Sequence, residues 1–269
     1  MSFNNWCNAL VLPVSSCLVA TVLLGNLPAK AQVSLSPLII EQSAERGQSQ
    51  SVITINNTSD QPFRARVYAE PFTYSRDDGF QVLETTPSDL TPYLQFSPRE
   101  LNVEPGQARK VRIITRFPPS LPTGEYRAVI FTENLRETID DSGNNVTIET
   151  RIGTTIYVRQ GNVSPQLEAV AASWDKEQQQ LQILINNSGD ASARTGVNWT
   201  LQQGEKMIAE GILLPVGIVA TSERNLSLSS ETDKQLQLTS GTYQLTGDLL
   251  WGNQENPESK SFSLDLIVP

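Results

Sequence analysis

One segment, residues 92–131, alternates strand-like runs with tight punctuation in a way that fits a β-protein. Within it, Glu104-Pro105-Gly106 predicts a turn, because proline fixes one backbone angle and glycine allows the next to be positive. Residues 109–115 then form a run of branched and charged side chains suited to a pleated surface. Prolines at 118, 119 and 122 exclude both helix and central strand until residues 125–131 resume the pattern. The segment therefore predicts sandwich strands.

Runs with a period of two residues extend this pattern through the whole chain. We expect strands near 33–42, 50–57, 62–70, 92–103, 108–117, 125–135 and 146–160, and after residues 161–165 a second series near 166–173, 180–187, 196–202, 206–213, 223–228, 234–238, 242–251 and 260–268. Seven strands in about 130 residues are typical of an immunoglobulin-like sandwich. The predicted fold is all-β, with two immunoglobulin-like β-sandwich domains in tandem at 32–162 and 163–269.

The two halves also echo one another. Ile55-Asn56-Asn57 recurs as Ile185-Asn186-Asn187, and Gly124-Glu125-Tyr126 recurs as Gly241-Thr242-Tyr243. In each half the paired asparagines end the second strand, and the tyrosine opens the sixth. There its hydroxyl is expected to bond to upstream backbone, as in the tyrosine corner of such sandwiches. The repetition predicts a duplicated fold.

The first 31 residues differ in kind from the rest. Ala9–Gly25 is almost wholly apolar, and Ala29-Lys30-Ala31 has the small-x-small form of a signal-peptidase site. We interpret residues 1–31 as a signal peptide, so the mature protein is expected in the periplasm, or alternatively at the cell surface, without a stable membrane anchor. The other interpretations are an uncleaved transmembrane helix, which Pro13 disfavours, and lipidation at Cys17.

Composition excludes several kinds of function. Both cysteines, Cys7 and Cys17, lie in the leader, and the chain has no histidine. The mature chain therefore has no disulfide, and it lacks the commonest general base and metal ligand. A net charge of −9 also argues against nucleic acid as a partner. We predict a protein that is not an enzyme and needs no cofactor or metal.

Two alternatives stay open at this point. Asp77-Asp78-Gly79 and residues 140–145 offer carboxylates that calcium could use, but neither has the full alternation of ligands ending in a glutamate. Pairs of carboxylates for glycosidase chemistry are plentiful, but no pair is marked above the rest. Loop turns and solvated charges are the simpler interpretation of both.

The order of features along residues 32–160 resembles the periplasmic pilus-assembly chaperones of the PapD type. The shared features are Val33-Ser34-Leu35, Ile55-Asn56-Asn57, Ser97-Pro98, residues 101–106 followed by Val111-Arg112, the proline loop, residues 125–131, and Tyr157-Val158-Arg159. The resemblance implies two sandwiches that hold an unfolded pilus subunit, or another secreted subunit, in a cleft. The last strand of the first sandwich would complete the sheet of this protein client.

In this chain the client-binding side chains would be Val146, Ile148, Thr150 and Ile152. The alternative for the same segment is an inner strand that only completes its own sandwich. The predicted function is an exported chaperone-like protein that binds subunits by β-strand addition. The second hypothesis is an extracytoplasmic structural or binding protein of two immunoglobulin-like modules.

The resemblance also assigns charged positions. Glu125 and Arg159 match charges that the family uses between its two domains. The family's two cleft cations, which hold the client's terminal carboxylate, are replaced here by Ile39 and Thr155. We expect Arg151, Arg64 or Arg66 to substitute for them.

Overall fold

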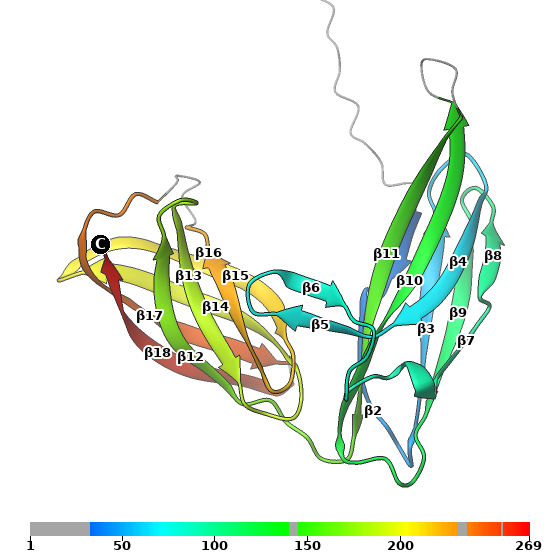
Figure 1. Cartoon of the computed structure of the whole chain (residues 1–269), viewed down its shortest axis with the longest axis horizontal. Helices are drawn as coiled ribbons and strands as arrows, with labels where there is room; N and C mark the ends of the chain where they lie inside the picture. The colour runs from blue at the N-terminus through cyan, green and yellow to red at the C-terminus, as the bar shows by residue number, and fades with distance from the viewer. Residues whose placement is uncertain (1–32, 140–144, 231–235, 254) are drawn as a thin grey trace, which may run out of the picture. The chain divides into compact units, whose positions relative to one another are not determined.

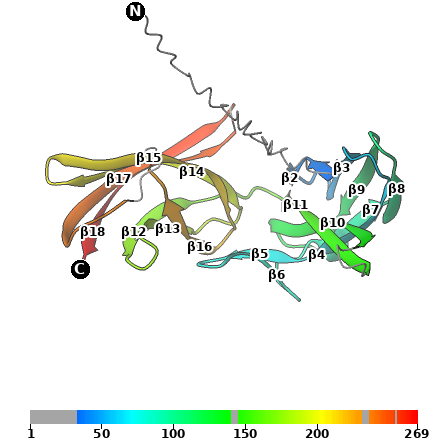
Figure 2. The same cartoon turned by 90° about the horizontal axis from the view of Figure 1, so that it is seen from above.

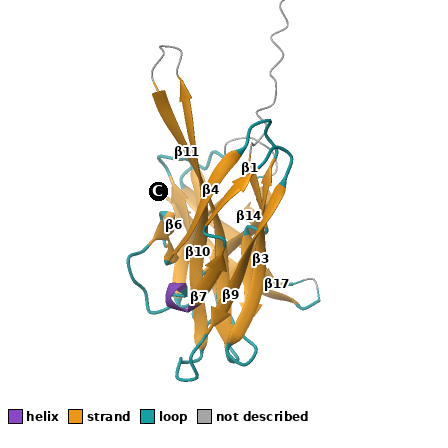
Figure 3. Ribbon diagram, turned by 90° about the vertical axis from the view of Figure 1, so that its right-hand side faces the viewer, coloured by secondary structure: helices purple, strands orange, loops and turns teal. Residues whose placement is uncertain are grey.

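Strands make up every described element except one short 3-10 turn, η1 (Thr91–Tyr93) (Figure 3). The computed structural model describes residues 33–139, 145–230, 236–253 and 255–269, without the side chains of residues 135–149. No helix in these ranges is long and apolar enough to cross a membrane. The all-β class predicted from the sequence is confirmed.

The first half of the chain forms a sandwich of two sheets (Figure 1). One sheet has the order β1 (Val33–Ser36), β3 (Gln48–Asn57), β9 (Ala108–Arg116), β7 (Leu94–Ser97). The other has the order β2 (Ile39–Ser43), β11 (Asn145–Gln160), β10 (Gly124–Ile139), β4 (Phe63–Glu70), β8 (Glu100–Val103). Alternate residues of facing strands, such as Ile53 and Ile55 on β3 and Ile156 and Val158 on β11, form a buried core between the sheets.

The second half repeats this plan with its own core. A three-stranded sheet has the order β12 (Leu167–Asp175), β13 (Gln180–Asn187), β16 (Ser222–Leu228), and a four-stranded sheet has the order β15 (Lys206–Ile218), β14 (Ala193–Gln203), β17 (Gly241–Gly252), β18 (Pro257–Val268) (Figure 2). Ile183, Ile185, Trp199 and Leu245 lie in its buried cluster. The two sandwiches in tandem match the predicted architecture, whereas the exact domain limits stay a prediction.

The repeated motifs play equivalent structural parts in the two halves. Asn57 and Asn187 are both buried and donate side-chain hydrogen bonds to backbone carbonyls across a turn. Tyr126 donates to the carbonyl of Pro122 at 3.0 Å, and Tyr243 donates to Thr239 at 2.9 Å. Both hydrogen bonds reach back four residues. The predicted tyrosine corners are therefore confirmed.

The structure corrects three predicted strands. The run 33–42 is divided at Pro37, and the run 92–103 at Pro98; in each case the two pieces enter different sheets. Proline cannot donate to a ladder, so it lies where the chain leaves one sheet for the other. In the predicted strand 234–238, residues 236–238 form a loop.

A further hairpin was missed by sequence reasoning. Strands β5 (Phe72–Ser75) and β6 (Gly79–Val82) pair only with each other in the described part of the chain. An isolated two-stranded ribbon is marginal in water, so side-chain packing must hold it. Phe72 provides that packing, because it is fully buried in a small cluster with Val129, Phe131 and Tyr157.

Candidate functional site

The candidate site is the outer edge of β11. This strand pairs with β10 along its whole length, from Gly124↔Gln160 to Ile139↔Asn145. On its other side it pairs with β2 only from Thr155 to Arg159, and the amide of Thr155 donates to the carbonyl of Leu38. Among the described residues, the stretch from Asn145 to Thr154 therefore has no strand partner on that side. Figure 1 shows the β10–β11 pair extending beyond the neighbouring strands.

Such an edge presents a row of unpaired N–H and C=O groups to any extended segment. The four predicted client-binding residues all lie on it. Thr150 is exposed and Ile152 is half-buried against the core, whereas the side chains of Val146 and Ile148 lie outside the described residues. Since side chains alternate along a strand, all four positions share the inward face with Ile156. The structure brings them together on one edge but does not test their role.

The two positions that replace the family's cleft cations lie side by side. Ile39 on β2 and Thr155 on β11 are partners in the parallel register. Thr155 is 8% exposed, and Ile39 packs against the cluster of Phe72 and Tyr157. This pair therefore offers no positive charge to a client carboxylate.

Two of the three candidate cations lie together on the outer face of the same sheet. Glu133 on β10 is the register partner of Arg66 on β4 and of Arg151 on β11. Arg66 donates to Glu133 across 3.3 Å, and its guanidinium lies 5.0 Å from the ring centre of Tyr68. Arg151 lies 4.3 Å from the ring centre of Phe131 and donates to the hydroxyl of Tyr68. The result is a row of two arginines around one buried carboxylate.

The third candidate cation, Arg64, does not join this row. Its side chain is mostly exposed and forms an ion pair with Glu100 on β8. The hydrogen bond that Arg64 donates to the Glu100 carboxylate raises the pKa of Arg64. Sequence reasoning missed another arginine, Arg127, which is buried and donates to the carbonyl of Phe72 at 3.3 Å. Desolvation by burial lowers its pKa, although Glu125 and Tyr157 oppose this shift.

Glu125 and Arg159 are register partners across β10 and β11, and their side chains meet at 3.3 Å. Both also bond to Ser192, which lies just before β14 in the second sandwich. Glu125 accepts from the amide of Ser192 at 3.0 Å and from its hydroxyl, and Arg159 donates to its carbonyl at 2.9 Å. The predicted inter-domain charges thus contact the second sandwich. The sequence held no signal for Ser192, because a small polar residue after a turn is too common to single out.

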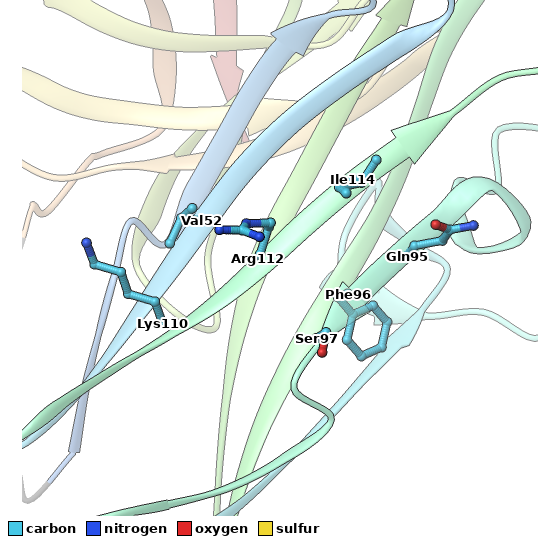
Figure 4. A pocket seen from close by; sticks show the side chains of 7 residues that line it. All are labelled: Val52, Gln95, Phe96, Ser97, Lys110, Arg112 and Ile114. Carbon is cyan, nitrogen blue, oxygen red and sulfur yellow. The ribbon is translucent and has the colours of Figure 1, made fainter.

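A hollow on the other sheet is separate from these residues. It lies over β3, β7 and β9, with Lys110 and Arg112 beside Val52, Phe96 and Ile114 (Figure 4). None of the residues predicted for client binding lines it. The strand edge, not this hollow, is therefore the candidate site.

Of the two acidic loops that were candidates for calcium binding, the structure describes only the first in full. In the first loop, Asp77 accepts a hydrogen bond from the side chain of Asn225, and the amide of Asp78 binds the hydroxyl of Ser75. The second loop, at 140–144, lies outside the described residues. Within the part of the chain that is described, no group of three acidic, histidine or cysteine side chains could hold a metal ion.

No family model and no curated protein sequence matches the chain. Solved structures do match. A chain of the chaperone–tip adhesin complex of CFA/I fimbriae biogenesis is 12% identical with a TM-score of 0.50, covering 87% of this chain and 99% of that one. The class 5 fimbriae chaperone CfaA is 13% identical with a TM-score of 0.50, covering 88% and 99%.

A third match is a chain of the CsuC–CsuE chaperone–tip adhesion subunit pre-assembly complex, from the archaic chaperone-usher Csu pili of Acinetobacter baumannii. It is 12% identical with a TM-score of 0.51, covering 88% of this chain and all of that one. At such low identity the likeness concerns the fold. The chain has the two-sandwich fold of chaperone-usher pilus chaperones, and the resemblance predicted from its sequence is confirmed at that level.

Proposed function

We propose that this chain is an exported, non-enzymatic chaperone that binds pilus or other secreted subunits by adding its β11 edge to their sheets. The observation that carries the proposal is the edge of residues 145–154, which in the described structure pairs with β10 on one side and with no strand on the other. Solved structures with this fold include a chaperone in complex with a tip adhesin and another with a tip adhesion subunit. Both complexes are consistent with a protein client for this chain. The predicted leader is consistent with a periplasmic location.

The physics of binding follows from strand geometry. Alternate residues turn their N–H and C=O groups toward the open side, so about half of the ten residues on this edge can pair with a client. Each hydrogen bond contributes only about 0.5–1.5 kcal/mol net, because water competes for the same groups. Apolar side chains at Val146, Ile148 and Ile152 would add affinity by entering pockets in the client.

The anchor for a client carboxylate differs from that implied by the family. Ile39 and Thr155 cannot bind an anion through charge, so we assign this role to the row of Arg66 and Arg151. Arg151 is four residues from Thr155 and on the same face of β11. Glu133 already takes one hydrogen bond from Arg66. A client carboxylate would therefore compete with Glu133, which makes the anchor weaker than an unopposed pair of cations.

The test is a double substitution on the outer half of β11. Val146→Asp with Ile148→Asp should abolish capture of periplasmic clients, because charges cannot enter apolar pockets without a desolvation cost of several kcal/mol. Co-purification from the periplasm followed by mass spectrometry measures capture, and a circular-dichroism melt reports folding. Thr147→Asp, on the opposite face of the same strand, is the matched control and should retain capture.

Two outcomes would reject the proposal. If the double variant loses its cooperative melt, Val146 and Ile148 belong to the protein's own core, since two unpaired charges would then be buried. If it stays folded and still captures the same clients, the edge of β11 is not the binding site. In either case the structural or binding module of two sandwiches becomes the better hypothesis.

A further inference from the structure

The inner face of the β10–β11 sheet changes from apolar to polar along its length. Ile130 on β10 is part of the core, but the next two inward positions of the strand are Thr132 and Asn134. Thr132 is 2% and Asn134 is 9% exposed. In the described part of the structure, the Thr132 hydroxyl and the Asn134 Oδ1 have no hydrogen-bond partner. Buried polar atoms are rarely left unpaired, so this end of the layer requires an explanation.

The position of Asn134 relative to the open edge of β11 supplies an explanation for its unpaired oxygen. Asn134 is the register partner of Ala65 on β4 and of Thr150 on β11. Exposure rises along this row, from the fully buried Ala65 through Asn134 to the exposed Thr150. The unpaired oxygen therefore lies one strand in from the edge that lacks a partner. The next row inward holds Val67 on β4, Thr132 on β10 and Ile152 on β11, so the position at the open edge changes from the polar Thr150 to the apolar Ile152.

A strand added at the edge of β11 would continue this row. Neighbouring strands lie about 4.8 Å apart, so an inward side chain of the added strand would stand beside Thr150. The Thr150 hydroxyl can accept a hydrogen bond from that side chain and donate its own proton to Asn134 Oδ1. Paired polar side chains across strands stabilise a sheet, whereas an apolar side chain would bury the Thr150 oxygen without a donor for its lone pairs.

We propose that Asn134 and Thr150 determine client specificity, by requiring a hydroxyl or amide side chain at the client position beside Thr150, with an apolar side chain beside Ile152. This inference rests on the proposed strand addition. It adds a sequence requirement that backbone pairing alone does not impose.

The test uses two synthetic peptides of nine residues that alternate valine with glutamine and carry a lysine at each end. They differ only in one central residue, which is valine in one peptide and threonine in the other. Because these side chains have nearly the same shape, any difference in binding comes from the hydroxyl. Fluorescence anisotropy of the labelled peptides with the whole mature chain measures the two dissociation constants.

The wild-type chain should bind the threonine peptide about three- to tenfold more tightly, as expected for one net hydrogen bond. Thr150→Val and Asn134→Leu should each remove this preference. Thr150 is exposed, so its variant should fold even if the buried substitution does not. Asn134→Leu should leave the melting temperature of the free protein unchanged or raised, because it removes an oxygen that has no partner.

Thr154→Val is the matched control on the same face of β11. The Thr154 hydroxyl is buried and already donates to the carbonyl of Pro37 at 3.2 Å, so its loss should lower the melting temperature but keep the peptide preference. Equal affinity of the wild-type chain for both peptides would overturn the polar requirement and leave strand addition intact. Binding of neither peptide would overturn both proposals. A clear loss of stability in a folded Asn134→Leu variant would also contradict the inference.

Discussion

Removing the carboxylate of Glu125 should destabilise the folded chain more than any surface substitution. The Glu125 side chain is fully buried and accepts hydrogen bonds from Arg159 and from both the amide and the hydroxyl of Ser192. Glu125→Ala leaves that buried amide without a partner, which by itself costs about 1–3 kcal/mol. Among the described residues, it also leaves the Arg159 side chain with one hydrogen bond, to the Ser192 carbonyl.

The whole loss can be estimated from these contacts. Breaking a buried ion pair by removing one partner costs about 3–5 kcal/mol. The Arg159 side chain is 28% exposed, so water can replace part of the lost interaction and the lower end applies. For a chain of this size, each kcal/mol lowers the melting temperature by about 2–4 °C. We therefore expect a fall of about 6–12 °C.

Calorimetry of the mature chain measures this fall. Glu168→Ala is the matched control, because Glu168 forms only an exposed ion pair with Lys260 at 3.9 Å. Such a pair contributes about 0–1 kcal/mol, so the control should melt close to the wild type. Glu125→Gln should lie between the two, since its amide oxygen can still accept from Ser192. If Glu125→Ala and Glu168→Ala melt at the same temperature, the bonds to Ser192 do not stabilise the fold.

Two further predictions concern alkali and reductant. Burial raises the pKa of Tyr157 far above its ordinary value of 10.0. Above pH 10 this tyrosine is therefore ionised in the unfolded chain but not in the folded chain. The folded state thus loses stability as the pH rises through 10. Tyr157→Phe should therefore lose less stability than the wild type between pH 9 and pH 11 in denaturant titrations; parallel curves would contradict this. Both cysteines precede the predicted cleavage after Ala31, so melting curves of the mature chain with and without dithiothreitol should coincide. An intact mass that includes Cys7 would contradict the predicted cleavage.

Much of the fold could be predicted because its signals are local. The turn at Glu104-Pro105-Gly106 is present, with a φ of 67° at Gly106 that glycine adopts easily. The inward alternation of Ile152, Ile156 and Val158 along β11 is also as expected. Where a proline lies inside a predicted strand, as at Pro98, the same local signals could not show that the chain changes sheets there. That choice depends on which partner strand is available.

For the candidate site, too, local features could be predicted from the sequence, whereas strand pairing could not. The sequence by itself determined that the chain forms β-sandwich strands, and that β11 has a period of two, because side-chain alternation is a property of the backbone alone. Only the tertiary structure decided that β2 covers β11 from Thr155 onward and leaves the preceding residues unpaired, or that Ser192 meets Glu125 from 67 residues away. Pairing and burial depend on contacts between segments distant in sequence, and no local pattern encodes which segments meet. The free edge and the unpaired Asn134 Oδ1 beside it therefore follow from the packing of the whole sandwich.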